Sequence, residues 1–239
     1  MKPLSGIRPI TESPVRKSIS LFLKAAVIFF SVYGTVKCAM DSLNAFMGGT
    51  RVFLFFTIQS NIGLAAISLI GACLLLAGRR IPAWWWTVRY VGVISISLTG
   101  AVFCFVLAPT MGGKAWTLVN IFTHVIVPIA SIADFFLSAI DADIPRSKVV
   151  YITFPPLAYV IFAGVGYILN WKFRADANYP YFFLNWGSPA GAFGFTSKLP
   201  FMGCVWWILL LLMLILLLGL LYLWILKKIR QGLTGAKEQ

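Results

Sequence analysis

The chain has 239 residues, of which 60% are hydrophobic and 11% are charged, and its mean hydropathy is +0.88. A soluble domain carries about 25% charged residues because its surface must be wetted, so the composition excludes a soluble enzyme, a nucleic-acid-binding protein and a disulfide-stapled secreted module. The formal net charge of +13 comes from Lys and Arg residues that sit at the ends of apolar runs, which indicates membrane orientation rather than nucleic-acid binding.

Six apolar runs predict six membrane-spanning helices, because a span needs about 20 mostly apolar residues. They lie at about 19–40, 52–77, 88–108, 115–140, 149–170 and 201–226. The sequence therefore predicts an all-α integral membrane bundle of six transmembrane helices, a single domain at 19–226 between basic tails at 1–18 and 227–239. The first run follows a basic segment, but it is long and no small-residue cleavage site stands out after it, so we expect a retained helix.

The Lys and Arg residues outside these runs predict the orientation of the bundle. Thirteen lie in the two tails and in the loops near 78–90 and 141–148, whereas five lie in the other three loops. By the positive-inside rule, both termini are expected to be cytoplasmic. Lys24 and Lys37 lie near the two ends of the first run, where long side chains can reach the headgroups, and we expect no chemistry from Lys24.

Polar residues gather on one side of the second run. Thr57, Ser60 and Asn61 fall on one helical face at spacings i, i+3 and i+4, and Gln59 lies beside them. Polar groups in hydrocarbon are expensive and mark either function or helix packing. Small polar residues also commonly make contacts between membrane helices, so this face can be either a functional site or a helix-packing surface.

The fourth run carries a similar face with Thr117, Asn120 and His124, which is the only histidine in the chain. Pro128 has no N–H to bond the carbonyl of residue 124 and predicts a kink there. Asp134 lies ten residues beyond His124, about 15 Å along a helix, which is too far to orient the imidazole. We assign it to a structural ion pair, with three candidate partners: Arg79, Arg80 and Lys148.

The two polar faces predict a nucleophile and a base. Thr57 and His124 are expected roughly 8 and 14 Å below the outer ends of their spans, so both lie in the outer half of the bilayer. If the faces meet, His124 can take the proton of the Thr57 hydroxyl and make it a nucleophile. Other polar side chains could then support the developing oxyanion, and the candidates are Asn61, Gln59, Ser60 and Asn120.

The longest loop, 171–200, is predicted to face outside. It is rich in aromatic rings suited to the membrane interface and in Pro and Gly residues that break regular structure. We expect it to lie on the outer membrane surface as a partial lid; its aromatic residues include Tyr179, Tyr181, Phe182, Phe183 and Trp186. The four cysteines lie in apolar stretches without metal-ligand spacing, so no metal or redox site is expected.

Four segments carry a resemblance. They read FFTIQSN (55–61), NIFTHVIVPIASIADFF (120–136), PPLAYVIFAGVGY (155–167) and YPYFFLN (179–185). In this order they resemble the androgen-induced family of six-span membrane hydrolases and its bacterial relatives, over about residues 20–225. The resemblance implies six helices with cytoplasmic termini, a bacterial inner membrane location, and cleavage of fatty acid esters of hydroxy fatty acids by an intramembrane threonine and histidine, which match Thr57 and His124.

The leading hypothesis is a membrane-embedded hydrolase of lipid esters that needs no cofactor or metal. Its partner is a membrane lipid or lipid-ester substrate, and no nucleic acid is expected. Four basic residues near the outer interface could weakly hold a substrate carboxylate: Lys37, Arg51, Lys172 and Arg174. The alternative is a non-catalytic membrane protein, either a scaffold or a transporter of small solutes or lipids. Transport is less favoured because polar groups in the spans are expected to thin out beyond Pro128.

Overall fold

A computed structural model describes residues 9–41, 49–78 and 81–235. Within this part of the chain there is no strand, and six helical spans are long and apolar enough to cross a membrane. They cover Pro14–Asp41, Phe56–Leu76, Ala83–Ala115, Leu118–Ser138, Arg146–Ile168 and Cys204–Thr234. The predicted all-α membrane bundle of six helices is therefore confirmed.

Three of the spans are continuous α-helices: α1 (Pro14–Asp41), α2 (Phe56–Leu76) and α8 (Cys204–Gly235). The third span runs through α3 (Ala83–Val102), a π-helical segment and α4 (Ala108–Met111). The fourth runs through α5 (Leu118–Ile121), a second π-helical segment and α6 (Val127–Ser138). The fifth begins as a 3-10 helix and continues as α7 (Phe154–Ile168).

Each π-helical segment ends just before a proline. The segments are Phe103–Leu107 and Phe122–Ile126, and the prolines are Pro109 and Pro128. Proline has no N–H for the carbonyl four residues earlier and its ring clashes with that carbonyl, so the wider π turn accommodates it. The irregularity expected beside His124 takes this form.

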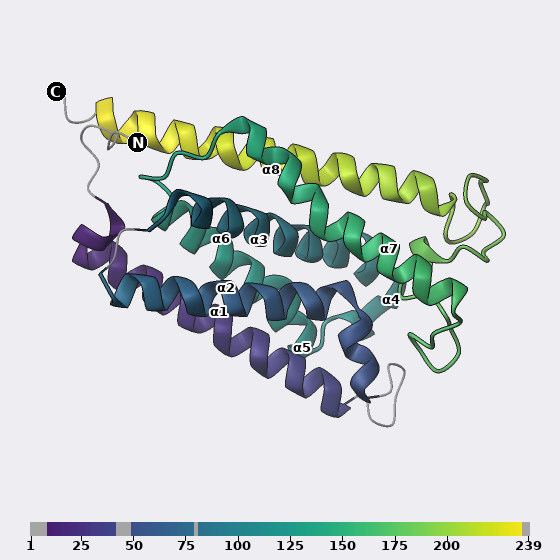
Figure 1. Cartoon of the computed structure of the whole chain (residues 1–239). Coiled ribbons are helices and arrows are strands. Elements are labelled where there is room, and N and C mark those ends of the chain that lie inside the picture. Colours follow the sequence, from purple (N-terminus) through teal and green to yellow (C-terminus); the bar gives the residue numbers. More distant parts are fainter. Residues whose placement is uncertain (1–8, 42–48, 79–80, 236–239) are drawn as a thin grey trace.

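The helices form three groups that lie side by side (Figure 1). The α1–α2 pair packs against α3 and α6 in the middle, and α7 and α8 lie on the other side. The start of α1 and the end of α8 meet around the turn after α6. Arg16 on α1 binds the Leu137 carbonyl and Asp141, and Arg230 on α8 binds the carbonyls of Ala139 and Ile140. Both ends of the described chain therefore lie at one end of the bundle, and the loop before α8 lies at the other (Figure 1).

An ion cluster joins α1, α3 and α6 inside the bundle. Lys24 Nζ lies 2.7 Å from Asp134 Oδ2, and Arg89 binds the same oxygen. Ser20 and Ser138 add hydroxyl contacts to the cluster. Lys24 is 1% exposed. A charge inside apolar surroundings persists only when it is paired, and Asp134 provides the pairing here.

This cluster corrects four expectations. Polar groups in the spans do not thin out beyond Pro128, because Asp134 and Ser138 lie there. Asp134 does form a structural ion pair, but with Lys24 and Arg89. Lys148 instead lies over the Tyr151 ring, and the other two candidates, 79 and 80, lie outside the described residues. Lys24 does not reach toward the headgroups. Arg89 is not a loop residue, because the third span begins at residue 83 rather than near 88.

Candidate functional site: an apolar pocket at the start of α2

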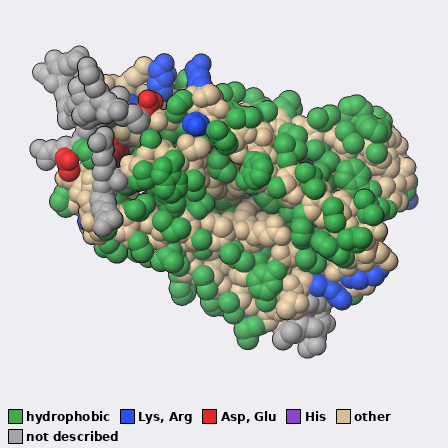
Figure 2. Space-filling model, in the orientation of Figure 1, with side chains coloured by type: hydrophobic (Ala, Val, Ile, Leu, Met, Phe, Trp, Pro, Cys, Tyr) green, Lys and Arg blue, Asp and Glu red, His purple; other side chains and the backbone are tan. Residues whose placement is uncertain are grey.

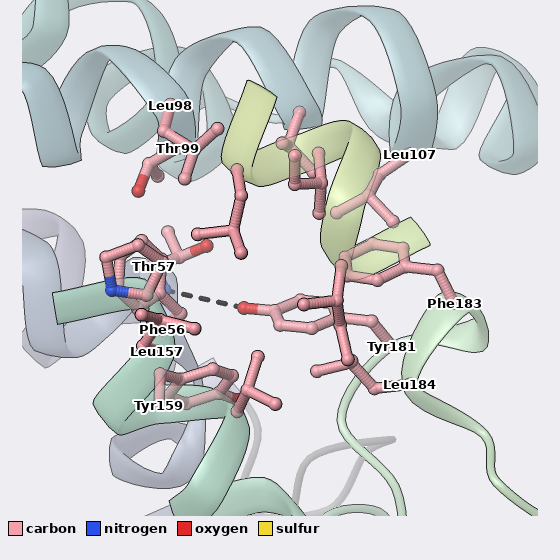
Figure 3. A pocket seen from close by; sticks show the side chains of 16 residues that line it. Phe56, Thr57, Leu98, Thr99, Leu107, Leu157, Tyr159, Tyr181, Phe183 and Leu184 are labelled. Carbon is pink, nitrogen blue, oxygen red and sulfur yellow. Dashed lines mark hydrogen bonds between the residues drawn. The ribbon is translucent and has the colours of Figure 1, made fainter. Parts of the chain in front are cut away.

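Thr57 lies at the wall of a buried apolar pocket. It is the second residue of α2, closer to the helix end than the sequence predicted, because Gly49–Leu54 forms a 3-10 turn rather than the start of the span. The pocket encloses about 650 Å³, including its open mouth, and is lined by aliphatic and aromatic side chains from α2, α3, α7, α8 and the loop before α8 (Figure 3). A concave wall that is mostly apolar and carries a few polar groups is typical of a small-molecule site.

Tyr181 partners Thr57 across this pocket (Figure 3). The Thr57 amide, one of the unsatisfied donors at the start of a helix, donates to the Tyr181 hydroxyl at 3.4 Å. That hydroxyl also interacts with the side chains of Thr57 and Tyr159. Burial raises the pKa of Tyr181 above its ordinary value, so the hydroxyl stays protonated at neutral pH and remains a hydrogen-bond donor.

The loop before α8 therefore does more than cover the membrane surface. The Tyr181 ring stacks on Phe183 with centroids 5.0 Å apart and meets the Phe55 ring edge-on. Phe183 and Leu184 are buried and line the pocket. The predicted interfacial lid is wrong for these residues, because the loop turns its apolar side chains into the bundle, where they bury more surface than at the interface.

Two of the expected supporting residues on α2 donate hydrogen bonds to the Thr57 carbonyl of the same helix. Asn61 is buried and its Nδ2 donates to the Thr57 carbonyl at 2.8 Å and to the Thr123 carbonyl at 3.3 Å. Ser60 Oγ donates to the Thr57 carbonyl at 3.0 Å and lies 2.9 Å from Thr99 Oγ1. Asn61 thus joins α2 to the π turn that holds His124.

The two other supporting residues point elsewhere. Gln59 is exposed and its amide donates to the Phe53 carbonyl at 3.1 Å. Asn120 Nδ2 donates to the Ala115 carbonyl at 2.7 Å. All three candidate amides therefore donate to backbone carbonyls, and Tyr181 is the polar donor that the sequence reasoning missed. The only indication of this role in the sequence is a tyrosine directly before the apolar run at 182–184.

His124 is held in one orientation inside the second π segment. Its ring stacks on Phe103 with centroids 3.9 Å apart, and its Nδ1 lies 2.9 Å from Thr123 Oγ1 and 3.0 Å from the Asn120 carbonyl. The Thr123 hydroxyl already donates its proton to the Val119 carbonyl, so both neighbours of Nδ1 can only accept. Nδ1 therefore carries the proton in the neutral ring, and Nε2 keeps a free lone pair.

The structure brings the second and fourth spans into contact but does not join the proposed pair. Among the described residues, no hydrogen bond links Thr57 to His124, and His124 is not part of the pocket wall that Thr57 lines. Asn61 connects their neighbourhoods by bonding both the Thr57 and the Thr123 carbonyls. The Thr57 hydroxyl faces Tyr181 instead.

The four basic residues considered for a substrate carboxylate are absent from the wall of this pocket. Lys37 pairs with Asp41 at 2.6 Å, and Arg174 lies 3.6 Å from Asp176. Lys172 is exposed, and Arg51 belongs to the 3-10 turn before α2. In the described residues no group of three His, Cys, Asp or Glu side chains is arranged to hold a metal ion.

The fold and the site together define an all-α integral membrane protein with an apolar pocket between its helices. No protein-family model, curated protein or solved structure matches the chain.

Proposed function

We propose that this protein is a membrane-embedded hydrolase that cleaves a lipid ester, of the fatty acid ester of hydroxy fatty acid type, at Thr57. The observation that carries the proposal is a largely apolar pocket in which the Thr57 hydroxyl faces the protonated Tyr181 hydroxyl. The other two hydroxyls in its wall, those of Thr99 and Tyr159, donate to backbone carbonyls. An apolar pocket with few polar groups suits an acyl chain with its ester at the polar spot. The resemblance noted above supports the same reaction and a bacterial inner membrane location.

In this mechanism the acyl chain occupies the pocket and its carbonyl carbon lies against Thr57 Oγ1. His124 Nε2 takes the hydroxyl proton as Oγ1 attacks, Tyr181 donates to the oxyanion, and the protonated imidazole then gives its proton to the departing alcohol. Water, deprotonated by the same nitrogen, then attacks the acyl carbon. The bond from this carbon to Thr57 Oγ1 breaks, the imidazole returns the proton to Oγ1, and the fatty acid leaves. The mechanism requires Thr57 and His124 to approach in the substrate complex, since catalytic hydrogen bonds often tighten only there.

A second candidate is non-catalytic binding of an apolar ligand in the same pocket. The observation that favours it is the place of His124, which stacks on Phe103 outside the pocket wall. A scaffold or carrier of this kind needs the cavity but no base.

Hydrolysis of a panel of lipid esters by the purified protein separates the two candidates. Thr57→Ala and His124→Ala should each lower kcat by at least about 10³-fold, and Thr57→Ala should also abolish covalent labelling by a fluorophosphonate probe. Thr110→Ala, at an exposed threonine in α4, is the matched control and should retain activity. Full activity of Thr57→Ala removes the mechanism, and ligand binding without turnover by the parent protein establishes the second candidate.

A further inference from the structure

A second hollow lies beside the pocket, on the outer face of the bundle. It runs between α2 and α7, with α3 as its floor, and encloses about 880 Å³ including its open side. Figure 2 shows a hollow near the middle of this face, with backbone and small side chains in it and hydrophobic side chains around it. We refer to it as the α2–α7 furrow.

We propose that the α2–α7 furrow binds one acyl chain of a bilayer lipid. Its walls carry no charged side chain, and Leu64, Ile67 and Phe162 give it an apolar surface. Both flanking helices are membrane spans, so the medium that meets the open side is hydrocarbon. A hollow of this kind is filled by the flexible chains around it, since an empty one would lose their dispersion contacts.

Small residues create the space. Gly63 is exposed on α2, and a Cβ atom added there would meet no atom within 4 Å. Ser95 on the floor and Ala158 on α7 are also small, and Gly92 makes room for the Ile67 side chain, because a Cβ atom added at Gly92 would lie 2.8 Å from Ile67 Cδ1.

The dimensions favour a lipid chain over a helix of another protein. The part of α2 that lines the furrow runs from Phe56 to Ile67, which is about 16 Å of helix. The hydrocarbon core is about 30 Å thick, so this length matches one leaflet, which is the depth that an acyl chain reaches, whereas a helix of another protein would contact α2 along its whole span. A flexible acyl chain can lie inside.

The furrow also adjoins the pocket that holds Thr57. Phe56 and Tyr159 line both hollows, with ring centroids 5.3 Å apart. The hydrogen bond between Ser60, which lines the furrow, and Thr99, which lines the pocket, crosses the same partition. The furrow is thus the place from which a bilayer lipid reaches Thr57, a role that rests on the proposed hydrolysis, whereas the binding itself does not.

Photo-crosslinking tests the binding. The full chain is placed in phosphatidylcholine vesicles doped with a phosphatidylcholine that carries a diazirine halfway along one acyl chain, and labelled residues are mapped by mass spectrometry. Label should concentrate on Leu64, Ile67 and Phe162. Gly63→Trp fills the furrow and should lower this label at least about fivefold. Gly164→Trp is the matched control, because Gly164 also has open space around it, lies on α7 and does not line the furrow.

Equal labelling of these residues in Gly63→Trp and in the parent, or label spread evenly over all lipid-facing helices, would overturn the inference. Crosslinks to a second protein chain at the furrow would overturn it in favour of a helix partner. Thr57→Ala should keep the label whatever its effect on hydrolysis. Label with no hydrolysis therefore refutes only the proposed function, and hydrolysis without label at the furrow refutes only the lipid site.

Discussion

At the scale of single residues, His124 is oriented by neighbours that lie close in the sequence. The Asn120 carbonyl and the Thr123 hydroxyl both accept a hydrogen bond from Nδ1–H of His124, as a carboxylate does in a hydrolase triad. His124 lies in the π turn that precedes Pro128, which cannot donate to the His124 carbonyl. The imidazole therefore leaves Nε2 unprotonated, as the proposed mechanism requires of a base.

The tautomer of His124 can be measured directly. Because the chain has one histidine, incorporation of ¹⁵N-histidine into protein carrying a histidine-free affinity tag reports this ring alone. We expect a protonated Nδ1 and an unprotonated Nε2 at neutral pH in detergent micelles, since both partners of Nδ1 can only accept. Thr123→Val should leave this tautomer in place through the Asn120 carbonyl. A proton on Nε2 in the parent protein would contradict the assignment.

Tyr181 is the residue whose role depends most on the proposed reaction. Tyr181→Phe keeps the ring that stacks on Phe183 and removes the hydroxyl that the proposed mechanism uses as the oxyanion donor. We expect kcat to fall about 10²-fold with little change in the thermal unfolding temperature. Tyr179→Phe, in the same loop but outside the pocket wall, is the control and should change kcat little. A drop in stability with unchanged kcat would make Tyr181 a packing residue.

At the scale of elements, three helices share one buried set of charges. Asp134 on α6 pairs with Lys24 on α1 and Arg89 on α3, so the cluster fixes how these helices pack. The set holds two positive groups for one negative group. Its stability depends on the single carboxylate, since removing one member of a buried ion pair leaves a charge without compensation.

Asp134→Asn should therefore be strongly destabilising. We expect a loss of about 3–5 kcal/mol in the free energy of unfolding, measured by denaturation in mixed micelles. Asp41→Asn, which removes the exposed partner of Lys37 on the same α1 helix as Lys24, is the control and should have almost no effect. Similar small effects of both substitutions would show that the buried cluster does not hold the three helices together.

At the scale of the whole molecule, both ends of the described chain lie at one end of the bundle, as an even number of spans requires. Arg89 belongs to the interior, but without it the count of basic residues is still twelve against five. The asymmetry continues to predict cytoplasmic termini.

Reporter fusions test this orientation in cells. Green fluorescent protein fused after residue 239 should fluoresce, because it folds in the cytoplasm, and alkaline phosphatase fused within the loop 171–200 should be active outside. The reverse pattern would place the Thr57 pocket nearer the cytoplasmic face and would refute the predicted topology.

The sequence by itself determined the class of this protein. Six apolar runs and a low charge content require helices in a bilayer, since only internally bonded helices can use such runs. It also determined which polar residues lie near one another along each span, because helical spacing is local. Ser60 and Asn61 lie beside Thr57 on α2 and bond its carbonyl, as their spacing of three and four residues predicts.

Only the tertiary structure decided which groups meet across helices. Lys24 and Arg89 join Asp134, and Tyr181 rather than His124 faces the Thr57 hydroxyl. Such contacts depend on the rotation of each helix about its axis and on how the loop before α8 folds inward. Both are set by packing between segments far apart in the chain, which no local pattern of residues encodes.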